Sequence, residues 1–297
     1  MGIIKIEYKY TQLNITGNEI IDRETGEAFD ISNAVILKKT ETGKISIHYA
    51  SFIYLNIEKL RGLLEKKIKQ IDLALLISMS SNLLISKNIS LKDDDTPHTA
   101  ASIGKLIGLS EQSTKLKLNR MEDEGLLHYG TLKQEKHFGK VYVLNPSLIK
   151  KGLSFSNSLI ELFYKPTAVK EDVASYCHYG EYFHIDTSRL LIVLEKKIKQ
   201  IDLALLVSMS CNLEEKVNIS LKDDDTPHTA ASIGKLVRLS EQSTKLKLNS
   251  LLKKDLLHYG VLRKKTDLGK VYVVNPHLIK TKKSFDSFIA VLFNDIE

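Results

Sequence analysis

Tryptophan is absent from this sequence, and cysteine occurs only twice. Cys177 and Cys211 occupy positions that do not correspond in the repeat described below, which disfavours a disulfide framework or a cysteine metal site. Apolar runs stay well short of the roughly 18 residues of a transmembrane helix, and the N-terminus lacks the basic-then-apolar pattern of a secretory signal. We therefore expect a cytoplasmic protein without a membrane partner.

Sequence motifs typical of enzymes are missing as well. The chain contains neither a phosphate-binding loop nor HExxH, neither a nucleophile elbow nor a tyrosine with paired histidines that would suggest strand nicking. Three aspartates at 93–95 precede His98, but adjacent side chains diverge in an extended loop, so a polar loop is favoured over a metal site. We expect a binding protein with no catalytic residue, no metal and no cofactor.

A long internal repeat dominates what is present. The stretch Glu65–Lys150 recurs as Glu195–Lys280 without a gap, which indicates a tandem duplication. We predict an N-terminal β-hairpin segment at 1–47, a first domain at 48–163, a linker at 164–177 and a second domain at 178–297. The function must therefore be inferred for one module, and the second module is expected to act in the same way.

Charge supports an anionic partner. The formal net charge is +7, and the excess of lysine and arginine lies in the repeats rather than in the N-terminal segment. A moderately basic module is typical of proteins that bind nucleic acid.

The pattern within one copy predicts mainly helices. Apolar residues at a 3.6-residue period indicate a helical pair or one long helix over 56–84. Thr99 is suited to cap a short helix at 100–107, and Ser110 to cap a longer one at 111–124. Two helices joined by a three-residue turn are typical of a helix-turn-helix.

Two β-prone segments follow, at 125–130 and 140–146, joined by a charged loop; this order predicts a wing. An apolar helix is predicted at 154–163, and the N-terminal segments 18–30 and 35–48 carry Thr-Gly turns that predict β-hairpins. The expected fold class is mainly α with small β wings, an α+β fold of two tandem winged helix-turn-helix domains preceded by N-terminal β-hairpins.

On the 111–124 helix, helical spacing predicts that Thr114, Leu118 and Met121 pack inward. The opposite face combines amide, ammonium and leucine side chains, which can contact adenine, guanine or phosphate, and thymine methyl groups. The predicted DNA contacts on the two helices are Gln112, Ser113, Lys115, Leu116, Asn119 and Arg120 in the first copy, and Gln242, Ser243, Lys245, Leu246 and Asn249 in the second.

Basic residues at the wing tips complete the predicted surface. The first tip contributes Lys133 and Lys136, and the second, more basic tip contributes Arg263, Lys264 and Lys265. Such side chains suit phosphate or minor-groove contacts.

The hairpin segment IDRETGE at Ile21–Glu27, the helix-turn-helix pattern, and LNPSLI at Leu144–Ile149 followed by Gly152 together resemble the RepL-type replication proteins of Firmicute plasmids. That resemblance implies a small winged-helix protein acting on plasmid DNA at an origin or control region. The second copy keeps VNPHLI at Val274–Ile279 but lacks the glycine and the first hairpin. The helix-turn-helix and wing are also similar to MarR-type regulators.

We therefore predict sequence-specific binding of duplex DNA with two similar half-sites, one chain acting as a pseudo-dimer. Two alternatives are retained: that the chain forms a homodimer, and that it contacts replication or transcription machinery. The expected function is a transcriptional regulator or a plasmid or phage control protein. A replication initiator at an origin is the alternative, and a winged-helix scaffold for protein interaction is a third hypothesis.

Overall fold

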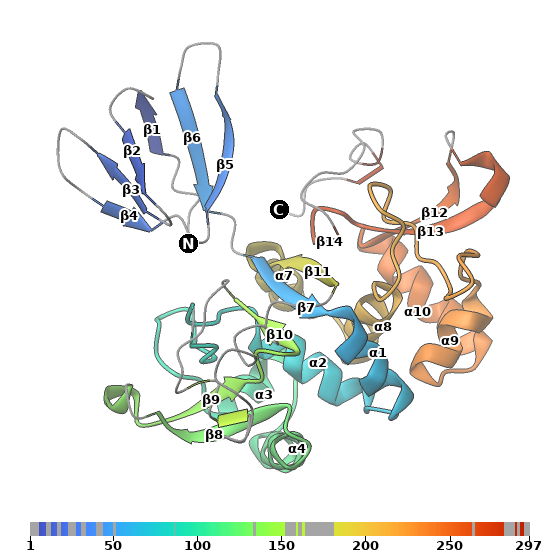
Figure 1. Cartoon of the computed structure of the whole chain (residues 1–297). Coiled ribbons are helices and arrows are strands. Elements are labelled where there is room, and N and C mark those ends of the chain that lie inside the picture. Colours follow the sequence, from blue (N-terminus) through green and yellow to red (C-terminus); the bar gives the residue numbers. More distant parts are fainter. Residues whose placement is uncertain are drawn as a thin grey trace, which may run out of the picture. The chain divides into compact units, whose positions relative to one another are not determined.

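The structure is a computed structural model in which α-helices combine with small antiparallel sheets (Figure 1). It describes the strands of the N-terminal segment and residues 52–85, 87–132, 135–151, 159, 162–163, 181–262, 265–281, 289 and 292–293. Eight α-helices lie within these residues, so the chain has a mixed α/β architecture compatible with the α+β class.

The chain forms two compact units, Met1–Phe52 and Ile53–Glu297. The first unit contains two three-stranded antiparallel sheets, of order β1-β6-β5 and β2-β3-β4. Their strands are β1 (Ile6–Lys9), β2 (Leu13–Thr16), β3 (Glu19–Asp22), β4 (Ala28–Asp30), β5 (Ala34–Lys39) and β6 (Lys44–Tyr49). Antiparallel pairing of β3 with β4 and of β5 with β6 confirms the two predicted hairpins, whose Thr-Gly turns lie outside the described residues.

The second unit contains both copies of the repeat, with the same elements in the same order. The first copy consists of β7 (Phe52–Asn56), α1 (Ile57–Glu65), α2 (Gln70–Met79), α3 (Ala100–Ile107), α4 (Glu111–Asp123), β8 (Leu127–Thr131), β9 (Lys140–Leu144) and β10 (Ile149–Lys150). The second consists of β11 (Tyr182–Asp186), α7 (Thr187–Glu195), α8 (Gln200–Met209), α9 (Ala230–Val237), α10 (Glu241–Lys253), β12 (Leu257–Val261), β13 (Lys270–Val274) and β14 (Ile279–Lys280). The linker expected at 164–177 and most of the helix expected at 154–163 lie outside the described residues.

Local capping explains where α3 and α4 begin. Thr99 forms a capping box with Ser102, and the Ser110 side chain accepts a hydrogen bond from the Ser113 backbone N–H. Both caps satisfy backbone donors that a helix start leaves without partners. The predicted caps and both helices are confirmed.

The turn between these helices takes the same shape in both copies although its residue differs. Gly108 ends α3 at a φ of 71°, and Arg238 ends α9 at a φ of 53°, both in the left-handed region. Glycine adopts this conformation without a steric penalty and arginine does not, so the fold imposes the turn at Arg238.

A two-stranded antiparallel hairpin follows α4 and is tied to the rest of its copy. β8 pairs with β9, and Ile89 bridges to Val143 on the free side of β9. The Asn145 side chain then donates to the Gly125 carbonyl and accepts from the Ser147 backbone N–H. The Asn-Pro motif that carries part of the family resemblance therefore joins the segment after β9 to the turn after α4.

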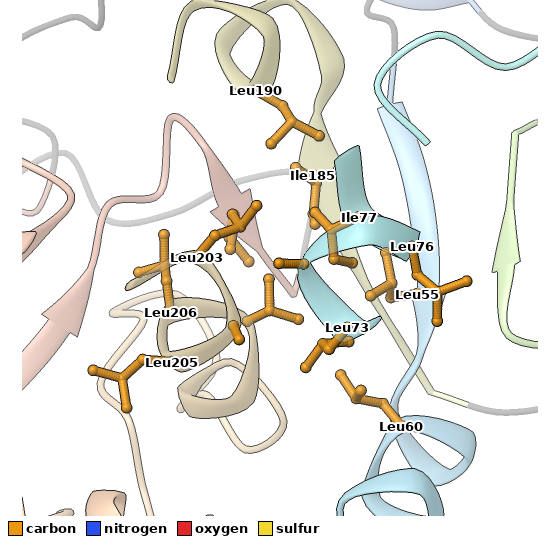
Figure 2. Packing of buried hydrophobic residues seen from close by; sticks show 14 of the residues in the cluster. Leu55, Leu60, Leu73, Leu76, Ile77, Ile185, Leu190, Leu203, Leu205 and Leu206 are labelled. Atoms are coloured by element: carbon orange, nitrogen blue, oxygen red, sulfur yellow. The ribbon is translucent and has the colours of Figure 1, made fainter. Parts of the chain in front are cut away.

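The two copies share one core rather than forming two separate ones. Helix α2 packs against α8, and a single four-stranded sheet of order β10-β7-β11-β14 runs through both copies. Figure 2 shows apolar side chains of α2 and α8 pointing toward one another, with Leu55, Leu60, Ile185 and Leu190 around them. All residues of α2 from Asp72 to Met79 are buried, because α8 covers the side that a lone module would expose.

Reciprocal hydrogen bonds cross this seam. The Gln70 side chain donates to the Val237 carbonyl at the end of α9, and Gln200 donates to the Ile107 carbonyl at the end of α3. Each glutamine thus caps a helix of the other copy, directly before the turn into α10 or α4.

Candidate nucleic-acid interface

Helix α4 has one face packed and one face in solvent. Thr114, Leu118 and Met121 are buried, which confirms the predicted inward side. The Thr114 hydroxyl donates to the Ser110 carbonyl over 2.9 Å. The helix is therefore fixed in rotation by its packed side, and its opposite side is presented to solvent.

The solvent side carries the predicted contact residues in both copies. Leu116 is 68% exposed and Leu246 is 66% exposed, a large apolar side chain in the middle of each polar face. The other residues of this face are Gln112, Lys115 and Asn119 in α4 and Gln242, Lys245 and Asn249 in α10, all exposed, with Ser113 and Ser243 half-buried beside them. The two faces are matched residue for residue.

Each face also carries an acidic residue near its lysine. Lys115 Nζ lies 2.6 Å from Glu111 Oε1, and Lys245 pairs with Glu241 at the same distance. The hydrogen bond with Glu111 raises the pKa of Lys115. Such exposed pairs contribute little to stability, so the ammonium groups can exchange the carboxylate for a phosphate.

Arg120 does not belong to this solvent face. Its guanidinium pairs with the carboxylate of Asp72, a buried residue of α2. The prediction from the sequence placed Arg120 at the flank of the outward face; the structure places its charged group against the core. In α10 the corresponding Ser250 hydroxyl donates to Asp202 Oδ2 over 2.8 Å.

The hairpin beside α4 adds an aromatic surface that was not predicted from the sequence. Tyr129 and Tyr142 are opposite in the β8–β9 register and stack with ring centroids 4.4 Å apart, and Tyr129 is 42% exposed. Lys140 Nζ lies 5.9 Å from the Tyr129 ring centroid. The Tyr129 backbone N–H donates to Glu122 Oε1 over 2.8 Å, which ties this surface to α4.

The second copy repeats the stack with Tyr259 and Tyr272, also 4.4 Å apart. The signal in the sequence for this aromatic surface is a pair of tyrosines at corresponding hairpin positions in both copies. Exposed rings beside a cation can contact sugars or bases as well as protein.

At the hairpin tips only part of the predicted surface is described. Lys136 is exposed, whereas Lys133, Arg263 and Lys264 lie outside the described residues. Lys265 Nζ pairs with Glu214 Oε1 at 2.5 Å. The charge of Lys265 is therefore paired within the protein.

The aspartate loop has a structural role. Asp94 accepts hydrogen bonds from the Thr96 backbone N–H over 3.0 Å and from its hydroxyl, and these bonds lower the pKa of Asp94. Among the residues that the structure describes, no group of three or more His, Cys, Asp or Glu side chains is placed to hold a metal ion.

Comparisons of this chain with protein-family models, with curated proteins and with solved structures each found no match. Within the described part of the chain, none of the helices is both long and apolar enough to cross a membrane.

Proposed function

We propose that this chain is a sequence-specific duplex DNA-binding protein built from two tandem winged-helix modules. In this proposal α3 and α4, and likewise α9 and α10, form helix-turn-helix motifs, and the hairpins β8–β9 and β12–β13 are the wings. Helices α4 and α10 enter the major groove, where their amide and leucine side chains contact base edges.

One observation carries the proposal. The same polar face, with the same exposed leucine at its centre, occurs on both α4 and α10, although nothing in the packing of the described residues requires it. Gln112 and Asn119 can each bridge N6 and N7 of adenine, and Leu116 can contact a thymine methyl group. Exposed Tyr129 and Lys140 lie on the hairpin tied to the same helix, where a wing would contact the backbone.

The shared core supports a pseudo-dimer. Because α2 and α8 pack together, the two recognition helices belong to one compact unit and need no second chain to hold them. The partner is then a duplex with two similar half-sites. The proposed role is a transcriptional regulator or a plasmid or phage control protein.

A replication initiator binding an origin is the second candidate, favoured by the resemblance of the N-terminal hairpin and of the Asn-Pro motif to RepL-type proteins. Footprinting across the plasmid or genome distinguishes the two roles. A site at a promoter supports the regulator, and an iterated site at an origin supports the initiator. A protein-interaction scaffold, the third hypothesis, predicts no salt-dependent DNA binding.

Base contacts are tested by selecting a preferred duplex and comparing it with random DNA. Gln112→Ala and Asn119→Ala are each expected to lose about 1–3 kcal/mol of preference for the selected site, with little change on random DNA. Gln242→Ala should lose a similar amount, because its surroundings match. Equal losses on selected and random DNA would show that these side chains do not contact base edges.

A further inference from the structure

Two buried carboxylates connect the central helices to α4 and α10. Asp72 of α2 is 2% exposed and Asp202 of α8 is 0% exposed, and they occupy corresponding positions in the two copies. Among the described residues, Oδ1 of each lacks a hydrogen-bond partner. A buried carboxylate that stays ionised loses its hydration, and a nearby cation or hydrogen-bond donors must compensate that loss.

The two copies supply that cation from different positions. In the first copy the Arg120 guanidinium pairs with Asp72. In the second copy the corresponding residue is Ser250, whose neutral hydroxyl cannot compensate the charge. Lys247 supplies the compensating cation in this copy, because its Nζ lies 3.5 Å from Asp202 Oδ1.

Because the cation beside the carboxylate differs, the lysine of the first copy that corresponds to Lys247 has a different environment. Lys117 corresponds to Lys247 and lies one turn before Arg120 on α4. In the first copy Arg120 pairs with Asp72, and Lys117 forms no ion pair with a described side chain. Lys117 is half-buried on α4. A lysine stem can pack along a protein surface while its ammonium stays in contact with solvent.

We propose that Lys117 is a phosphate-contacting residue of the first copy, that Lys247 is not one in the second, and that Arg120 and Ser250 determine this difference through the buried carboxylates. The inference rests on the proposed DNA-binding function. Arg120 and Ser250 act as positioning residues rather than as DNA contacts. The two half-sites are then bound unequally, with one more ionic contact at the first.

Exchanging the residues between copies tests the proposal on the full chain. Ser250→Arg should place a guanidinium against Asp202 and release Lys247. Each added phosphate contact steepens the dependence of log affinity on log salt by about 0.9, so a fourfold rise in salt should weaken binding about 3.5-fold more than in the wild type. Arg120→Ser should have the opposite effect, since Lys117 is drawn to Asp72.

A matched control separates release of the lysine from direct contact by the new arginine. Adding Lys247→Ala to Ser250→Arg should abolish the steeper slope if Lys247 makes the contact. Lys117→Ala alone should flatten the slope by about 0.9, whereas Lys247→Ala alone should leave it unchanged. Lys247→Ala combined with Asp202→Asn repeats that comparison without a buried, unpaired charge, and circular dichroism confirms that each variant is folded.

The outcomes distinguish the inference from the function on which it rests. Wild-type chain that shows no salt-dependent affinity for any duplex overturns both. Two results overturn the inference alone, provided that the wild type binds DNA. In the first, Ser250→Arg leaves the salt dependence of affinity unchanged. In the second, Ser250→Arg steepens it and the added Lys247→Ala does not remove the effect. A steeper slope that Lys247→Ala removes supports it.

Discussion

Replacement of Gly104 by alanine should destabilise the protein, contrary to the expectation from helix propensity. Gly104 lies inside α3 where that helix meets α4 and the intervening turn. A Cβ at this position would lie 2.5 Å from Thr114 Oγ1 and 2.7 Å from the Leu109 carbonyl oxygen. Thr114 is buried and hydrogen-bonded to the Ser110 carbonyl, so neither neighbour can move away without breaking other contacts.

The expected change in the free energy of unfolding has one stabilising and two destabilising contributions. Alanine is favoured over glycine in a helix by about 1 kcal/mol. Overpacking a tight site costs roughly 1–3 kcal/mol, and losing the Thr114 hydrogen bond costs about 0.5–1.5 kcal/mol. The net expectation is a loss of roughly 0.5–3.5 kcal/mol in the free energy of unfolding.

Gly62 provides the matched control. It also lies inside a helix, α1, but a Cβ there would meet nothing within 4 Å. The second copy carries Ile192 at this position, which shows that a side chain is tolerated. Gly62→Ala should therefore gain up to about 1 kcal/mol from helix propensity alone.

Urea unfolding followed by circular dichroism compares these variants. Gly234→Ala should lose about as much as Gly104→Ala, because its Cβ would lie 2.6 Å from Thr244 Oγ1 and 2.7 Å from the Leu239 carbonyl oxygen. If Gly104→Ala stabilised the chain as much as Gly62→Ala, the close approach of α3 to α4 would be refuted.

Two further predictions follow from the buried histidines and the shared core. Burial lowers the pKa of His98 from 6.5 to about 4 and lowers the pKa of His228 as well. Between those pH values the unfolded chain binds a proton at His98 that the folded chain does not. The free energy of unfolding should therefore fall as pH drops from 6.5 to 4, by on the order of 2 kcal/mol for His98. In urea titrations, His98→Gln should show a flatter dependence of stability on pH. Because α4 and α10 contribute to one core, the proposed DNA binding predicts one chain per minimal selected duplex in sedimentation, and two chains would contradict the proposed pseudo-dimer.

Much of each copy could be predicted from the sequence because the governing interactions are local. Thr99 and Ser110 cap helices through backbone groups three residues away, and the apolar spacing of Thr114, Leu118 and Met121 fixes which side of α4 is buried. The outward face follows by exclusion. The N-terminal hairpin pairing was likewise predictable from short-range turn residues.

The position of Arg120 was not predictable in the same way. A helical projection places it beside Gln112 and Asn119, and its partner Asp72 lies on a different helix. Which cation satisfies a buried carboxylate depends on which side chains the tertiary fold brings within reach. The tyrosine stack depends in the same way on the register of β8 and β9.

The sequence by itself determined that the protein has two matched modules, and it determined the helices, caps and outward faces within each. Only the tertiary structure decided that α2 and α8 join these modules in one core, because an apolar run such as that of α2 can be buried against its own module or against another. Tertiary structure also decided which cation pairs with each buried carboxylate, Arg120 in the first copy and Lys247 in the second. Local residue patterns encode secondary structure and exposure, whereas long-range packing selects the partners of each charged group.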